Sequence, residues 1–203
     1  MIYHKAIFAD QLTPVSAFLR ISEGVERAFL LESVEGGEKI GRYSFIGINP
    51  EKRFEGKFSD FRKSFPEDDP PDPNLPPFTG GAVGVFCYDM VRELEKLPDL
   101  NGWGESQSRT GMSSVNMDFY STILAFDHVS QQIVIMSHRS QQEVDDLEAR
   151  LRKGINKVDV SSALGRISLC ITLHYAIHSN NFCKRNHILQ HITEKEAGIF
   201  FII

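Results

Sequence analysis

The fold is decided by the stretch Phe29-Leu-Leu-Glu-Ser-Val-Glu-Gly-Gly-Glu-Lys-Ile-Gly-Arg-Tyr-Ser-Phe-Ile-Gly47. Its two apolar ends flank a charged turn that contains adjacent glycines, a pattern that predicts strands at Ala28–Val34 and Tyr43–Ile48. This interpretation places Glu32 and Ser33 at the end of a strand. A desolvated polar group without a hydrogen-bond partner costs about 1–3 kcal/mol, so a buried Glu or Ser needs a partner there. A small polar ligand could be that partner.

The remaining sequence predicts further strands and flanking helices. Thr13, Pro14 and Gly24 punctuate a first helix, and Ser140 with Glu143 predicts a capping box for a helix that ends near Gly154. Strands in neighbouring runs, with helices between the groups, favour an α+β fold with a largely antiparallel sheet or sandwich and flanking helices. The other predictions are strands at Arg53–Phe58 and Gly81–Tyr88, a short helix from Asp89 to Pro98, a hairpin of Phe119–Phe126 with Gln132–Ser137, and loops at Phe65–Pro77 and Asp99–Val115.

Composition excludes several classes of function. The 203 residues are 41% hydrophobic, enough for a sizeable core, and the net charge of −5 disfavours binding of nucleic acid. No apolar stretch reaches the roughly 20 residues that cross a bilayer, and the opening residues do not resemble a signal peptide. The three cysteines are unevenly spaced, which argues against a disulfide framework. We therefore expect a cytoplasmic protein without a membrane segment.

A second motif, Phe78-Thr-Gly-Gly-Ala-Val-Gly-Val-Phe-Cys-Tyr-Asp89, follows the first in the chain. Together the two motifs closely resemble the N-terminal region of anthranilate synthase component I, the chorismate-using subunit that opens tryptophan biosynthesis. The resemblance covers Thr13 to about Leu151. It implies a lyase that converts chorismate to anthranilate and pyruvate, with Mg²⁺ in the C-terminal half, ammonia from a glutamine amidotransferase subunit, and feedback inhibition by tryptophan.

The resemblance also divides the chain. Residues 1–154 correspond to the N-terminal domain, 155–180 to a linker, and 181–203 to a truncated beginning of the chorismate-binding catalytic domain. We expect this last part to begin with a helix near Asn181. Ala197-Gly198-Ile199-Phe200 is similar to the family's Ala-Gly-Asp-Ile-Phe but lacks the Asp. The apolar Gly198–Ile203 is a β-forming segment, and we expect no later residues to pair with it or cover it. We also expect the fragment alone to be inactive and to bind no cofactor, since Mg²⁺ belongs to the missing domain.

The tryptophan inhibitor site of the family includes its Leu-Leu-Glu-Ser element, which corresponds to Leu31, Glu32 and Ser33. A carboxylate can bind the α-ammonium of an amino acid while a hydroxyl holds it in register. The resemblance further implies Arg42 as the basic residue of this half-site and Tyr43 as a wall for the indole. Without the resemblance, Glu32 and Ser33 would end a strand and Arg42 would be a surface partner. The glycines at 80, 81 and 84 match no phosphate-binding loop, and close backbone packing explains them.

Three alternatives remain. Aminodeoxychorismate synthase component I, of folate biosynthesis, shares the architecture and differs in product. A non-enzymatic amino-acid-binding module is a second alternative. The third is a zinc site in the C-terminal segment, where Cys and His recur at intervals of four that would align them on helices, although the alternating apolar residues there also suit a strand. The residues concerned are Cys170, His174, His178, Cys183, His187 and His191.

Overall fold

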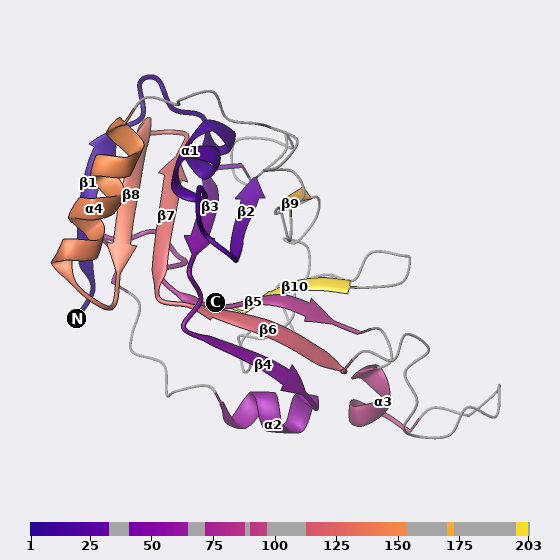
Figure 1. The fold of residues 1–203 in the computed structure, drawn as a ribbon. Coiled ribbons are helices and arrows are strands. Elements are labelled where there is room, and N and C mark those ends of the chain that lie inside the picture. Colours follow the sequence, from indigo (N-terminus) through magenta and orange to yellow (C-terminus); the bar gives the residue numbers. More distant parts are fainter. Residues whose placement is uncertain are drawn as a thin grey trace.

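The computed structural model describes residues 1–32, 41–64, 72–87, 90–96, 113–153, 170–172 and 198–202. The described residues form two β-sheets with helices on their outer sides (Figure 1). The elements in chain order are β1 (Tyr3–Phe8), α1 (Pro14–Ile21), β2 (Ala28–Glu32), β3 (Tyr43–Ile48), β4 (Lys52–Gly56), α2 (Phe58–Lys63), β5 (Gly81–Phe86), α3 (Val91–Leu94), β6 (Val115–Tyr120), β7 (Thr122–Asp127), β8 (Gln132–Ser137), α4 (Gln141–Arg152), β9 (Cys170–Thr172) and β10 (Gly198–Ile202).

The larger sheet, called sheet A, has the strand order β1-β8-β7-β3-β2-β9, and the smaller one, sheet B, has the order β10-β5-β6-β4. Every pairing is antiparallel except that of β2 with β9, which is parallel. Figure 1 shows sheet B extending away from the lower end of sheet A. The predicted α+β class with largely antiparallel sheets is confirmed.

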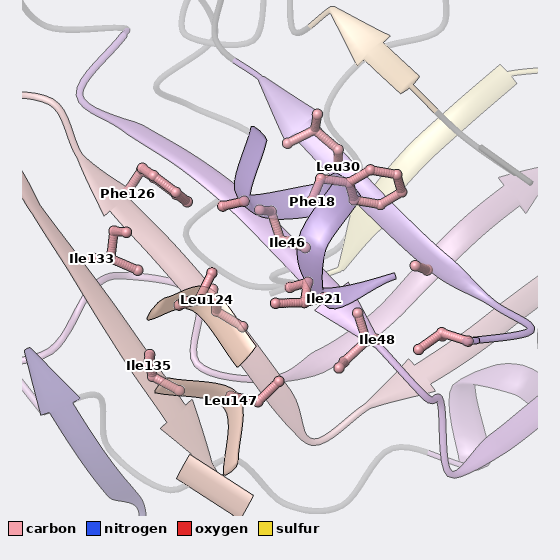
Figure 2. Packing of buried hydrophobic residues seen from close by; sticks show 14 of the residues in the cluster. Phe18, Ile21, Leu30, Ile46, Ile48, Leu124, Phe126, Ile133, Ile135 and Leu147 are labelled. Atoms are coloured by element: carbon pink, nitrogen blue, oxygen red, sulfur yellow. The ribbon is translucent and has the colours of Figure 1, made fainter. Parts of the chain in front are cut away.

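Helices α1 and α4 cover one face of sheet A. Thr13 caps α1: its hydroxyl accepts from the Ser16 amide at 3.1 Å, while Ser16 Oγ accepts from the Thr13 amide at 2.9 Å. The apolar stripes of both helices pack on alternate residues of β2, β3, β7 and β8, because side chains in a strand alternate between its two faces. Figure 2 shows this core, which includes Phe18, Ile21, Leu30, Ile46, Ile48, Leu124, Phe126, Ile133, Ile135 and Leu147.

The opposite face of sheet A packs against sheet B. This second core contains Phe29, Leu31, Phe78, Val83, Tyr120, Ile123, Ala125 and Met136. All six residues of β7 are buried, because helices cover one face of the strand and sheet B covers the other. A third cluster, centred on Phe61 and Phe86, lies between sheet B and α2.

Several predicted boundaries change in the structure. The predicted strand Phe119–Phe126 is two strands in different sheets, because β6 ends at Tyr120 and β7 begins at Thr122. The predicted strand Arg53–Phe58 ends as β4 at Gly56, and its last residue begins α2. Strand β1, which forms one edge of sheet A, has no counterpart among the elements predicted from the sequence.

The predicted capping box at Ser140 forms only in part. The Ser140 hydroxyl accepts from the Glu143 amide at 3.3 Å. The Glu143 carboxylate accepts instead from Ser137 Oγ at 2.9 Å. Glu143 therefore links α4 to the end of β8, which a local capping signal does not reveal.

The C-terminal residues contribute strands to both sheets. The apolar segment at the end of the sequence finds its partner earlier in the chain: β10 pairs with β5 from Gly198 opposite Phe86 to Ile202 opposite Ala82. Cys170–Thr172, within the predicted linker, pairs with Leu30–Glu32 of β2. The helix expected from Asn181 falls on residues that lie outside the described ranges. The next described residue is Gly198, where β10 begins.

Candidate functional site

The end of β2 divides its last two residues between opposite faces of sheet A. Leu31 is only 2% exposed, lies in the core between the sheets, and is paired in register with Phe45. Glu32 is half-buried and follows Leu31, so its side chain leaves the strand on the helix-covered face. Ser33 lies outside the described residues. A ligand that touches both Leu31 and Glu32 must therefore sit at the strand end rather than flat on either face.

Arg42 lies just before β3, at the same end of sheet A, and it forms a two-pronged ion pair with Asp127 of β7. Arg42 Nη2 donates to Asp127 Oδ2 at 2.7 Å, and Nε lies 3.2 Å from each carboxylate oxygen. The Arg42 side chain is 51% exposed and that of Asp127 is 9% exposed. The hydrogen bonds from Arg42 lower the pKa of Asp127 to about 2, aided by the amides of Ser130 and Val129 and opposed by burial.

Tyr43 joins this ion pair to a row of aromatic rings. The Arg42 guanidinium carbon lies 4.8 Å from the centre of the Tyr43 ring, and Tyr43 stacks on Phe45 with centroids 5.9 Å apart. Phe45 in turn meets Phe78 edge-to-face at 5.6 Å. Burial, and to a smaller extent the charge of Asp127, raise the pKa of the Tyr43 hydroxyl, while Arg42 opposes the rise. Tyr43 can thus offer a neutral aromatic wall.

Ser44 carries a second polar group at this strand end. Its side chain is fully buried, and its Oγ is hydrogen-bonded to His128 Nε2 at 2.8 Å. The register that pairs Leu31 with Phe45 brings Ser44 opposite Glu32. Glu32 and Ser44 therefore share the helix-covered face, whereas Leu31, Tyr43 and Phe45 share the other.

Four further residues belong to this strand end but were not predicted from the sequence as parts of the site: Asp127, Ser44, His128 and Phe78. Asp127 ends β7, and its carboxylate accepts from the Val129 amide at 3.0 Å in the turn to β8. An Asp at the start of a hairpin turn is a signal that sequence reasoning can use for a turn. Its pairing with Arg42 across 85 positions has no comparable local signal.

The glycines of the second motif have the packing role that the sequence predicted. A Cβ on Gly84 would lie 2.1 Å from the Asn116 carbonyl oxygen, and one on Gly80 would lie 3.0 Å from that of Tyr120. Gly81 has a φ of 140°, which other residues rarely adopt. Close approach of backbones in and beside sheet B therefore explains Gly80 and Gly84, and the backbone conformation explains Gly81.

No group of three or more His, Cys, Asp or Glu side chains that could hold a metal ion occurs among the residues that the structure describes. Cys170 lies in a strand, β9, whereas the zinc hypothesis aligned its first trio along a helix. The other Cys and His residues of that hypothesis lie outside the described ranges. Within those ranges, no helix is long and apolar enough to span a membrane.

Comparison with known proteins finds relatives that are named as anthranilate synthase subunits. The chain is 36% identical over 151 residues to anthranilate synthase component 1 of Acetivibrio thermocellus, covering 64% of this chain and 29% of that protein. It is 31% identical over 165 residues to the Thermus thermophilus protein of that name, covering 73% and 34%. The chain is a partial homologue of anthranilate synthase component 1. The resemblance seen in the two motifs is thereby confirmed.

A longer alignment, to anthranilate synthase component 1 of Acinetobacter calcoaceticus, has 29% identity over 218 residues and covers 93% of this chain and 42% of that protein. No family model matches the chain. The solved structure of anthranilate synthase component I from Streptococcus pneumoniae has a TM-score of 0.41 and 19% identity, covering 81% of this chain and 37% of its own. The chain thus spans about a third of the length of these anthranilate synthase relatives.

The two motifs that carry the anthranilate synthase resemblance meet in space. Phe78, from the second motif, contacts Phe45 of the first motif and also lies 6.3 Å from Phe29, centroid to centroid. Phe29 covers Gly47, its register partner, where a Cβ would lie 2.2 Å from the ring. Phe29 and Phe45 of the first motif and Phe78 of the second therefore belong to one packing unit between the sheets.

Proposed function

We propose that this chain is the tryptophan-binding, regulatory and structural part of an anthranilate synthase component 1. The observation that carries the proposal is that Glu32 and the Arg42–Tyr43 pair lie at the same end of sheet A, at the end of β2 and the start of the neighbouring strand β3. A free amino acid has an ammonium group, a carboxylate and, in tryptophan, a large aromatic side chain. The strand end presents chemistry for each of these groups.

Glu32 would bind the ammonium group, since a carboxylate forms charge-assisted hydrogen bonds with it. Ser33 would add a hydroxyl partner. Leu31 and Tyr43 would form the apolar wall against the indole, on the side of the strand end that faces sheet B. Asp127 accepts hydrogen bonds from Nε and Nη2 of Arg42. The Nη1 atom of Arg42 makes no hydrogen bond with the described residues. Arg42 could therefore bind the carboxylate of the effector without leaving Asp127.

The activity of the whole protein is a proposal that rests on the names of the relatives. A complete component 1 would act as a lyase on chorismate and release anthranilate. The name "component 1" also implies a second component, which the resemblance identifies as a glutamine amidotransferase subunit. The residues that bind chorismate and Mg²⁺ would lie in the part of the relatives that this chain does not span. We therefore expect this chain to be cytoplasmic, regulatory, and inactive alone.

Isothermal titration of L-tryptophan into the purified 203-residue protein tests the effector site. We expect saturable binding that Glu32→Gln weakens by about 10-fold or more, because a hydrogen bond between charged groups contributes about 1.5–3 kcal/mol. Glu23→Gln is the matched control: it makes the same chemical change on an exposed residue after α1, and should leave binding unchanged. Absence of heat with tryptophan, or equal weakening by both variants, would contradict the proposed site.

Two further measurements separate the alternatives. Anthranilate is fluorescent, so incubation of the chain with chorismate, Mg²⁺ and ammonia tests whether the fragment is inactive. Appearance of anthranilate would contradict that expectation. Titration with other amino acids tests the alternative of a general amino-acid-binding module, which would bind several of them equally. The relatives reported above bear the name anthranilate synthase, which favours this family over aminodeoxychorismate synthase.

A further inference from the structure

Three segments of the chain, called passages below, converge at one corner of the molecule: two of them cross between sheet A and sheet B, and the third leads into β5 of sheet B. The link from β3 to β4 is Asn49–Glu51, and Ser121 alone links β6 to β7. The segment Thr79-Gly80 leads into β5. The dipeptide His138-Arg139, which follows β8 and precedes α4, contacts all three passages.

Arg139 reaches two of the passages with one guanidinium group. Its Nε lies 2.8 Å from Glu51 Oε1 and 2.9 Å from Ser121 Oγ, and its Nη2 donates to the Asn49 carbonyl oxygen at 3.0 Å. Ser121 Oγ also donates to Glu51 Oε1 at 2.6 Å. Nη1 lies 3.5 Å from Glu143 Oε1 on α4. The hydrogen bond from Ser121 and the contact with Arg139 lower the pKa of Glu51, which keeps this carboxylate charged.

His138 connects the third passage. Its Nε2 donates to the Thr79 carbonyl oxygen at 3.2 Å, and its backbone amide donates to the Ser121 carbonyl oxygen at 2.9 Å. A Cβ on Gly80 would lie 3.1 Å from His138 Nε2, so the imidazole fits closely against a residue without a side chain. Thr79 directly follows Phe78, whose ring meets Phe45 of sheet A.

Apolar packing between the sheets is concentrated near this corner. Val83 and Tyr120 are the strand residues of sheet B in the shared core, and Phe78 precedes the first residue of β5 by three positions. Farther along β6, Asp118 and Asn116 lie on the same face as Tyr120, because every second residue of a strand points to the same side. The face of sheet B toward sheet A is therefore polar along this part of β6. The part of sheet B farther from the corner therefore lacks apolar contacts with the described part of sheet A. The contacts at the corner then have a large influence on the angle between the two sheets.

We propose that His138 and Arg139 form a clasp that fixes the angle between the two sheets and thereby holds Phe78 against Phe45. A guanidinium group suits this role because it is planar and presents its donors in a rigid fork. The planar guanidinium group of Arg139 binds acceptors on two separate passages, and these contacts restrict rotation of one sheet relative to the other. The histidine restrains the third passage independently. The clasp does not depend on whether the chain binds tryptophan.

Residual dipolar couplings of backbone amides test the clasp directly, because they report the relative orientation of rigid units. In the wild-type chain, we expect couplings from sheets A and B to fit one alignment tensor. In Arg139→Gln, we expect the two sheets to require separate tensors and contacts between the rings of Phe78 and Phe45 to weaken. Exchange of the His138 amide proton should also accelerate by roughly tenfold, because local opening breaks its bond to Ser121.

Two further variants sharpen the test. Arg139→Lys keeps the charge but loses the planar fork, so it should resemble Arg139→Gln if geometry matters and the wild type if charge alone matters. Arg152→Gln, on the 69%-exposed arginine paired with Glu148, is the matched control and should retain one tensor. If Arg139→Gln does not fold, Ser121→Ala removes the bridging hydroxyl without a charge change and should give the same loss of common alignment. A single alignment tensor in Arg139→Gln would overturn the proposal, and so would a single tensor in Ser121→Ala if that variant has to replace Arg139→Gln. Wild-type behaviour of Arg139→Lys would overturn it as well.

Discussion

Arg20 and Arg150 each cap the C-terminal end of the helix that carries the other. Arg20 of α1 donates through Nη1 to the Leu151 carbonyl oxygen of α4, and Arg150 of α4 donates through Nη2 to the carbonyl oxygens of Ile21 and, at 3.0 Å, Glu23. The last carbonyl groups of a helix lack intrahelical partners, and cations near them interact favourably with the helix dipole. The two helices over sheet A therefore complete each other's ends.

This relationship predicts that Arg150→Gln destabilises the fold. Without the charged donor, the carbonyl groups of Ile21, the last residue of α1, and of Glu23 lose this partner. We expect the free energy of unfolding to fall by about 1–2 kcal/mol. Denaturation by urea measures the change. Arg152→Gln is the control, because its exposed ion pair with Glu148 should contribute less than about 0.5 kcal/mol. Equal losses in the two variants would contradict the capping role of Arg150.

Gly84→Ala should destabilise the protein by about 2–3 kcal/mol or prevent folding. The added methyl group would lie 2.1 Å from the Asn116 carbonyl oxygen and 2.8 Å from the Met117 Cα, both backbone atoms of the paired strand β6. Gly56→Ala is the control, since its nearest contact is the Phe54 ring, a side chain, at 3.1 Å. Thermal unfolding distinguishes them: a melting temperature of Gly84→Ala at or above that of the control would show that β5 can shift away from β6.

Phe78→Ala should cost about 3–4 kcal/mol, because it removes a large buried ring from between the two sheets. Phe78 is 3% exposed and contacts both Phe29 and Phe45. Phe8→Ala removes a ring of the same size that is 73% exposed, and should change the stability by less than about 0.5 kcal/mol. The measurement is the urea midpoint of each variant. A small effect of Phe78→Ala would mean that the two motifs are not joined through this ring.

The fold class could be predicted from sequence because its determinants are local. Thr13 with Ser16, and Ser140 before α4, are helix starts that short-range chemistry specifies. The passage at Ser121 could not be predicted, because Val115–Asp127 is a nearly continuous β-forming run in which one residue changes sheets. What decides the change is the contact of Ser121 with Glu51 and Arg139, which come from distant parts of the chain.

The candidate site was predictable only through its resemblance to a family. Periodicity places Leu31 in a core and Glu32 at a strand end, but it does not assign a ligand to either residue. The partner of Arg42 is 85 positions away, and that of Ser44 is 84 positions away. Such pairs arise from the register of β3 with β7, which no local pattern encodes. Tertiary pairing therefore determines which polar groups surround the strand end.

The Arg42–Asp127 pair predicts a pH dependence of stability with a definite sign. The pKa of Asp127 is lowered from 3.8 to about 2 in the folded chain, so the unfolded chain binds a proton more readily. The stabilisation is therefore fully present above pH 4 or so and is lost as the pH falls toward 2. Carbon-13 NMR of the Asp127 carboxyl group measures this titration directly.

Arg42→Gln should raise the pKa of Asp127, because it removes the largest cause of the shift. The amides of Val129 and Ser130 remain, so part of the lowering should persist. Arg53→Gln removes an arginine paired with Glu55 in sheet B, and should leave the Asp127 titration unchanged. If Arg42→Gln gave the wild-type titration curve, the turn amides alone would account for the low pKa. Arg42 would then be held at the strand end by its contact with Tyr43 rather than by Asp127.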